Sequence, residues 1–299
     1  MKNMIVERKY LPALSKLFSA IVMNSIEQKG TSKYMIEVCK NSGMDKYLDP
    51  SIKISQVFDL VYNLIIKDYR NEYIYKNIIV QKLLLGKHSL NTTQLLTEFR
   101  IGKNKADVIL LNGTSYVYEI KSEYDSLKRL EIQLRSYLDA FDFINVITYP
   151  SLVNKILPVI SDKIGVLVLT NKNTISTIRR PKSNRKNINP LVLFDSLRKD
   201  EYLNIINKYY RYIPDVPNTK INKYCKELFS KIPPNEAHDL VINVLKERNH
   251  SNILKEFINK APKSTFAYAL SIGDKKKKLE RLIEIFDSKI EYKSFSKVN

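Results

Sequence analysis

The stretch from residue 95 to residue 148 constrains the fold of this chain more than any other. Four short runs rich in β-branched and aromatic residues follow one another there, at residues 95–101, 106–111, 116–121 and 143–148. Turns that contain Gly102 and Gly113 separate the first three runs, and a helix-forming segment at 125–141 precedes the fourth. This order predicts a three-stranded meander, a crossover helix and a further strand, so we expect an α/β chain with a mixed sheet.

Helical patterns flank this stretch on both sides. Near the N-terminus, Leu14, Leu17, Phe18, Ile21 and Val22 recur at helical spacing and predict one apolar stripe. Residues 68–85 predict a further helix, residues 164–170 a buried strand and residues 191 onward helices again. We therefore expect a helical N-terminal segment at 1–67, an α/β core at 68–190 and a helical C-terminal region at 191–299.

The formal net charge of +19 over 299 residues favours a polyanionic partner. A lysine-rich codon bias in an AT-rich genome is the alternative explanation of the charge. No apolar run approaches the roughly 18 residues of a membrane span, and no signal-peptide core is present, so we expect a cytoplasmic protein without a membrane partner. With only 7 glycines the chain has no GxxxxGK phosphate loop, so ATP use is not expected.

Charged residues inside the strands give the strongest functional signal. Glu119 and Lys121 are two residues apart on one strand and project from the same face. A two-residue turn at Asn112-Gly113 would set Asp107 opposite Tyr118 on the other face, whereas a three-residue loop brings Asp107 onto the face of Glu119. A metal site that uses both Asp107 and Glu119 requires the three-residue loop.

The preceding turn adds a further acid to this face. A two-residue Gly102-Lys103 turn sets Glu98 opposite Asp107. Carboxylates in apolar strands need a partner. A set of carboxylate oxygens together with the main-chain carbonyl oxygen of Ile120 would suit Mg²⁺ or Mn²⁺. Such a metal lowers the pKa of a bound water, which Lys121 would orient, and this chemistry hydrolyses phosphodiesters.

At these residues the chain resembles the PD-(D/E)xK nuclease superfamily. The resemblance implies a restriction-endonuclease-like core, a mixed sheet flanked by helices, with Asp107 and Glu119 as the motif acids and Lys121 as the motif lysine. The superfamily often supplies another acid from its first helix or first strand. Glu72 and Glu98 are the matching positions, and the register argument favours Glu98.

The crossover helix carries a second likeness. Arg129, Gln133 and Tyr137 are spaced by four residues and form one stripe, and Gln133 with Tyr137 resembles the QxxxY signature of RecB-type members. Taken together, segments such as RNEYIYKN, EFR and YEIKSEYDSLKRL look most like the Sce-type family. This is a poorly characterised bacterial family found near phage or mobile-element genes. That resemblance implies a role in phage defence or in DNA processing.

These observations predict a Mg²⁺-dependent nuclease whose expected substrate is DNA rather than RNA. A homodimer is compatible with the sequence. Phosphate contacts are expected from basic and polar residues of the strands, the crossover helix and the loop at 171–190, which contains Pro181: Arg100, Arg129, Gln133, Tyr137, Arg179, Arg180, Lys182, Arg185 and Lys186. The alternative is a protein of the same fold that binds nucleic acid, or regulates a partner, without cutting. A helical interaction scaffold whose charge is only codon bias is the third reading.

Overall fold

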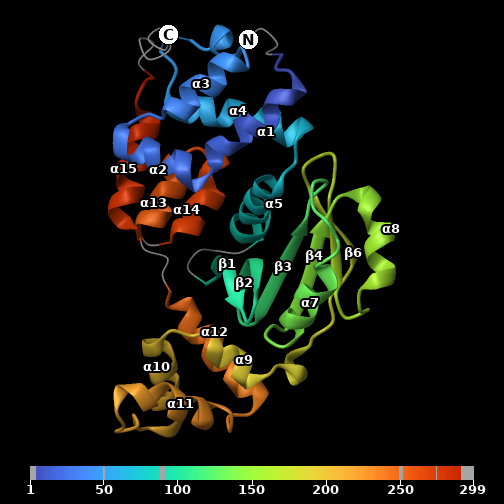
Figure 1. Ribbon diagram of the computed structural model, residues 1–299, viewed down its shortest axis with the longest axis vertical. Helices are drawn as coiled ribbons and strands as arrows, with labels where there is room; N and C mark the ends of the chain where they lie inside the picture. The colour runs from blue at the N-terminus through green and yellow to red at the C-terminus, as the bar shows by residue number, and fades with distance from the viewer. Residues whose placement is uncertain (1–4, 50, 88–91, 249–251, 274, 291–299) are drawn as a thin grey trace. The chain divides into compact units, whose positions relative to one another are not determined.

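The structure is a computed structural model that describes residues 5–49, 51–87, 92–248, 252–273 and 275–290. The chain forms two compact units, one of Met1–Gly86 with His250–Asn299 and one of Lys87–Asn249 (Figure 1). These units do not coincide with the expected segments 1–67, 68–190 and 191–299, because helices from the two ends of the chain pack together in one unit.

The unit that joins the two ends of the chain is helical in its described residues. Its helices, which short 3-10 turns connect, are α1 (Leu11–Ser15), α2 (Ala20–Lys29), α3 (Lys33–Asn41), α4 (Ile54–Asp68), α5 (Glu72–Ile79), α6 (Leu85–Lys87), α13 (Asn252–Lys260), α14 (Phe266–Ile272) and α15 (Lys276–Asp287). A π-helical turn, Val80–Leu84, separates α5 from α6. The single helix expected at 68–85 therefore begins at Glu72 instead, where the Asn71 side chain caps the Ile74 amide.

Aromatic packing joins the N-terminal and C-terminal parts of this unit. The Phe58 ring of α4 meets Phe18 and Phe286 edge to face, with centroids 5.5 Å and 5.3 Å away. Beside this cluster the main-chain amide of Ile54 donates to the carbonyl of Ser288 at 3.0 Å. The apolar stripe of α4 is thus covered by α1 and α15.

The apolar stripe predicted near the N-terminus is correct except at one residue. Leu14, Leu17, Phe18 and Val22 are buried, but the Ile21 side chain is 82% exposed. The chain makes a 3-10 turn over Lys16–Phe18, and Ser19 then takes an extended conformation as the N-cap of α2. This break shifts the helical phase, so the spacing before Ser19 does not continue after it.

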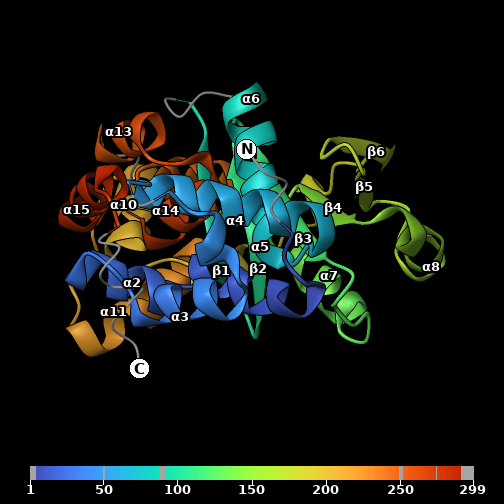
Figure 2. The ribbon, with the colours of Figure 1, turned by 90° about the horizontal axis from the view of Figure 1, so that it is seen from above.

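The second unit contains a six-stranded mixed sheet, in the order β1-β2-β3-β4-β5-β6 (Figure 2). Its strands are β1 (Gln94–Ile101), β2 (Asn104–Leu111), β3 (Ser115–Lys121), β4 (Phe143–Thr148), β5 (Gly165–Leu169) and β6 (Ile175–Arg179). Neighbouring strands are antiparallel except for the parallel pairs β3–β4 and β4–β5. The expected α/β class, a mixed sheet flanked by helices with helical terminal segments, is confirmed.

Two glycines set the register of the meander. Leu111 pairs with Ser115 across the three-residue loop 112–114, in which Gly113 has a φ of 69°. Ile101 pairs with Asn104 across a two-residue turn in which Gly102 has a φ of 55°. Both turn lengths required by the sequence argument are therefore confirmed.

Strand β6 is the element that the sequence argument missed. Residues 171–190 were expected to form a loop, yet Ile175–Arg179 pairs antiparallel with β5 at the edge of the sheet. Pro181 does fall outside the strand, two residues after its end. The pairing follows a tight turn at Asn173, whose φ of 57° is one that asparagine tolerates.

Six α-helices complete the described part of this unit, namely α7 (Leu130–Leu138), α8 (Val153–Ile156), α9 (Pro190–Asp195), α10 (Lys199–Tyr210), α11 (Asn218–Phe229) and α12 (Pro234–Lys246). Leu134 and Tyr137 of α7 belong to the same buried cluster as Val117 and Val146 of the sheet. Helices α9 to α12 form a block after the sheet (Figure 1), and their buried residues belong to the same cluster. Among the described residues of both units, no helix is both long and apolar enough to cross a membrane.

Candidate functional site

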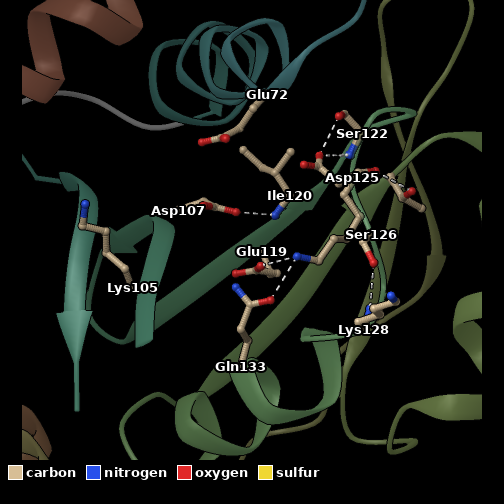
Figure 3. A network of polar contacts seen from close by, with 12 residues as sticks. Glu72, Lys105, Asp107, Glu119, Ile120, Ser122, Asp125, Ser126, Lys128 and Gln133 are labelled. Carbon is tan, nitrogen blue, oxygen red and sulfur yellow. Dashed lines mark hydrogen bonds and ion pairs between the residues drawn. The ribbon is translucent and has the colours of Figure 1, made fainter. Parts of the chain in front are cut away.

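The register brings the two predicted acids of the meander onto one face of the sheet. Asp107 and Glu119 lie one step beyond the last β2–β3 pair, Val108 with Tyr118, and so stand opposite one another. At this point the carboxylate of Asp107 accepts a hydrogen bond from the main-chain amide of Ile120 at 2.8 Å (Figure 3). The Asp107 side chain therefore holds the end of β3 beyond the last main-chain pair between β2 and β3.

Glu119 and Lys121 form a buried ion pair. The Lys121 Nζ lies 2.8 Å from Glu119 Oε1 and 3.0 Å from Gln133 Oε1, so it donates to both (Figure 3). The Glu119 side chain is 1% exposed and that of Lys121 is 9% exposed. Each charge is thus neutralised inside the unit rather than by solvent, which is the condition under which a buried pair is tolerated.

The second oxygen of Glu119 faces Tyr137 of helix α7. The Tyr137 hydroxyl lies 2.8 Å from Glu119 Oε2 and 2.9 Å from the carbonyl oxygen of Lys105, and its one proton can be donated to only one of these acceptors. Burial, followed by the charge of Glu119, raises the pKa of Tyr137, so the hydroxyl stays protonated. Gln133 and Tyr137 lie on one stripe of α7, as their spacing predicted, and from it both contact the ion pair.

Glu98 is the residue of this face with unusual backbone geometry. The β1–β2 register places it opposite Asp107, and its φ of 55° is uncommon for a residue with a side chain. Its carboxylate forms an ion pair with Lys105 at 3.0 Å. Arg100, the cross-strand partner of Lys105, is exposed. Glu98 therefore stands at the position that the register argument predicted.

Glu72, the other predicted acid, belongs to the helical unit. It is the first residue of α5, where a carboxylate is favoured by the helix dipole, and it forms an ion pair with Lys76 at 2.5 Å. The choice between Glu72 and Glu98 as a third metal ligand stays a prediction.

The proposed metal ligands are already engaged in this structure. Both oxygens of Glu119 accept hydrogen bonds within the unit, and one oxygen of Asp107 accepts from Ile120. The Mg²⁺ or Mn²⁺ site, with the main-chain carbonyl of Ile120 as a further ligand, and catalysis by this cluster stay predictions.

The predicted phosphate-binding residues fall into anchored and exposed groups. The Arg179 guanidinium donates to the carbonyls of Ile164 and Ser161, at 2.8 Å and 2.9 Å, so it holds the end of β6 in place. Lys182 forms an ion pair with Asp162 at 2.5 Å, and Arg185 forms one with Asp239. The exposed group, which forms no ion pair with a described residue, is Arg100, Arg129, Arg180 and Lys186.

Sequence reasoning missed a buried polar network that ties the helical block to the sheet. The Ser115 hydroxyl lies 2.8 Å from His238 Nε2 and accepts from the Asp142 amide at 2.9 Å. The Asp142 carboxylate accepts in turn from Ser183 and Thr114. Burial, followed by the charge of Arg185, lowers the pKa of His238. The available signal was the position of His238 on the apolar face of α12, beside Val241 and Ile242.

Comparison with known proteins gives the family. The sequence profile of the family described as bacteriophage P4 protein cII matches residues 66–272, which is more than half of the chain. The chain belongs to the bacteriophage P4 protein cII family. Protein cII of Enterobacteria phage P4 is 26% identical over 173 residues, which cover 56% of this chain and 64% of that protein. The match thus spans less than two thirds of the length of this curated relative.

A solved structure adds only a weak likeness. A protein of unknown function from Silicibacter pomeroyi matches with a TM-score of 0.28 and 15% identity, over 42% of this chain and 87% of its own. At that score nothing follows from the likeness.

The family match corrects the functional prediction. Membership of the PD-(D/E)xK superfamily and of its Sce-type family is wrong, and the predictions built on it, a nuclease that hydrolyses phosphodiesters and acts in phage defence, are wrong with it. The physical reason is that an acid followed by Glu-x-Lys is a short pattern in a chain with 50 basic residues. In this unit Glu119 and Lys121 neutralise one another in the interior of the fold.

Proposed function

We propose that this protein binds nucleic acid without cutting it. The observation that carries the proposal is the composition of residues 163–186, here called the basic hairpin. It contains seven cationic residues and no carboxylate: Lys163, Lys172, Arg179, Arg180, Lys182, Arg185 and Lys186. A nucleic-acid backbone is the polyanion that such a surface attracts.

The geometry of the basic hairpin supports phosphate contact. Strand β5 is buried throughout, whereas the middle of β6, at the edge of the sheet, is exposed. Arg179, Lys182 and Arg185 are held by partners within the unit, so the hairpin has a fixed shape. Four exposed cations form no ion pair with a described residue and carry the proposed contacts: Lys163, Lys172, Arg180 and Lys186.

The absence of cleavage is supported by the buried ion pair and by the family. A lysine that is bonded to Glu119 and Gln133 is engaged in the interior of the fold. The family to which the chain belongs is named after a phage protein. In the proposed function, the net charge of +19 serves binding to nucleic acid.

Salt titration of binding tests the proposal. A fluorescein-labelled duplex is titrated with the full chain at several salt concentrations, and the slope of log K against log salt is measured by anisotropy. Four phosphate contacts predict a slope of roughly −3.6, at about −0.9 per contact. The pair Arg180→Ala and Lys186→Ala is expected to reduce that slope by about 2.

The matched control removes two exposed lysines of the helical unit, Lys29→Ala and Lys46→Ala, and should leave the slope unchanged. Binding with no dependence on salt would contradict the proposal. Supercoiled plasmid incubated with the chain and millimolar Mg²⁺ should stay supercoiled, and nicking that EDTA abolishes would show that the protein cuts.

A further inference from the structure

A second surface of the sheet-containing unit combines exposed aromatic rings with cations. It comprises residues 209–224, which run from the end of α10 into α11, and is here called the tyrosine turn. It contains four tyrosines and three cationic residues, against one carboxylate, Asp215. The turn lies in the block of helices α9 to α12 (Figure 1) and contributes nothing to the buried ion pair or to the basic hairpin.

The tyrosines are ordered from the inside of the block outward. Tyr210 is fixed by a hydrogen bond from its hydroxyl to the carbonyl of Leu228 at 2.8 Å. Its ring meets those of Tyr209 and Tyr212, with centroids 4.9 Å and 6.4 Å away. Tyr212 is nevertheless 44% exposed, and Tyr224 of α11 is 43% exposed. An anchored ring therefore supports an outer pair that presents aromatic surface to solvent.

Tyr212 and Tyr224 lie close to one another. Burial, followed by the neighbouring Tyr224 hydroxyl, raises the pKa of Tyr212, so the Tyr212 side chain stays neutral at physiological pH. Tyr224 lies at the side of the buried stripe of Ile221, Cys225 and Phe229 on α11 and is not part of it. Packing of the helix therefore does not require an aromatic residue at position 224.

Arg211 occupies a conformation that an arginine adopts at a cost. It follows α10 as a C-cap with a φ of 63°, and its amide donates to the carbonyl of Asn207 at 2.8 Å. Glycine or asparagine is the common choice in this left-handed position, because the Cβ of most other residues is crowded there. An exposed guanidinium is thus retained directly before Tyr212 at a conformational cost.

The cations of the tyrosine turn are not neutralised within the described parts of the chain. Arg211, Lys220 and Lys223 are exposed and form no ion pair with any described residue. Nearby Lys226, in contrast, is held by Asp195 at 2.6 Å. Lys220 lies one helical turn before Tyr224 on the same side of α11, and Lys223 is the residue directly before Tyr224 in the chain.

We propose that the tyrosine turn binds single-stranded nucleic acid, with bases stacked on Tyr212 and Tyr224 and phosphates bound by Arg211, Lys220 and Lys223. Stacking on aromatic rings requires bases whose faces are free, which a duplex does not offer. Positive charge around the rings complements a nucleic-acid backbone. The inference rests on the proposed function and specifies it, because it names the strand state that the protein prefers.

The experiment compares three ligands on the full chain: a labelled 20-nucleotide DNA strand of mixed sequence, the same sequence as RNA, and the DNA duplex. The variant is the pair Tyr212→Ala with Tyr224→Ala. Affinity for single strands is expected to fall about fivefold or more for each ring removed, because a stacked base contributes roughly 1–3 kcal/mol. Duplex affinity should be unchanged, and the DNA and RNA strands tell which sugar the site prefers.

Two controls keep the test specific. Tyr212→Phe with Tyr224→Phe retains the rings and should retain the affinity, which also separates stacking from misfolding. Tyr47→Ala removes a tyrosine of similar exposure, 41%, from the helical unit and should change nothing. Ultraviolet cross-linking of a bromouridine-containing strand should label peptides from residues 209–224.

Failure of the inference and failure of the proposed function give different results. If the unsubstituted chain binds none of the three ligands, the proposed function is wrong. If it binds them but the alanine pair leaves single-strand affinity unchanged, only the inference is overturned, and the exposed rings then serve a protein partner. Equal losses with phenylalanine and alanine would also overturn the stacking role.

Discussion

Replacing Lys121 by methionine tests whether the buried ion pair is structural. The substitution keeps the length of the side chain but removes the positive charge that Lys121 places 2.8 Å from Glu119. It also leaves Gln133 Oε1 without the hydrogen bond from Lys121. Leaving a buried carboxylate uncompensated costs about 3–5 kcal/mol. For a unit of this size that corresponds to a fall in melting temperature of about 6–20 °C.

A control and a compensating variant make this prediction sharp. Lys182→Met removes an exposed partner of Asp162 and is expected to cost about 1 kcal/mol or less. Combining Lys121→Met with Glu119→Gln removes both buried charges, and we expect it to recover most of the loss, to within about 1–2 kcal/mol of the unsubstituted chain.

The assay is urea unfolding followed by far-ultraviolet circular dichroism, with amide exchange of β3 used to assign the change to the sheet-containing unit. Equal costs for Lys121→Met and Lys182→Met would refute the structural role of the pair. So would a double variant that is less stable than Lys121→Met alone, because the carboxylate would then not be the source of the loss.

Two further predictions concern the same unit. Because the pKa of His238 is lowered in the folded state by burial and by Arg185, the unfolded chain takes up a proton first, so stability should fall as the pH drops from about 6.5. Urea midpoints at pH 7.5 and pH 5 should show this fall, and His238→Gln should reduce it. A Cβ added at Gly165 would contact the Asn145 side chain and approach the Pro181 nitrogen to 2.9 Å, so Gly165→Ala should cost about 1–3 kcal/mol. An unchanged melting temperature for Gly165→Ala would contradict that contact.

The central strands were predictable because several local signals agreed. The apolar runs are bounded by turns, and the charged residues inside them required a common face. That requirement selected the three-residue loop at Asn112–Thr114 over the two-residue turn that Asn-Gly usually favours, and the structure has the longer loop. The need to place the charged side chains on one face therefore predicted the length of this loop correctly. Turn propensity alone would have predicted the two-residue turn.

Other elements were missed because their causes lie outside the local sequence. Strand β6 carries one isoleucine on each face and is exposed in its middle, so its sequence lacks alternation, and it forms because the buried strand β5 offers it a free edge. Ile21 is exposed because Ser19 restarts the helix. The contact between Ser115 and His238 joins positions 123 residues apart and depends on how α12 packs, which no spacing rule predicts.

The nuclease motif shows why correct geometry did not give the correct function. Each residue lies where the motif required: Asp107 opposite Glu119, and Glu119 on the same face as Lys121. The same arrangement has a structural use, because a buried pair is satisfied only in one register. A slip of one residue in β3 would turn both charges to the other face, away from Gln133 and Tyr137. The pair therefore fixes the register of β3 and the rotation of α7 together, and that requirement alone accounts for an acid and a lysine two residues apart in an apolar strand.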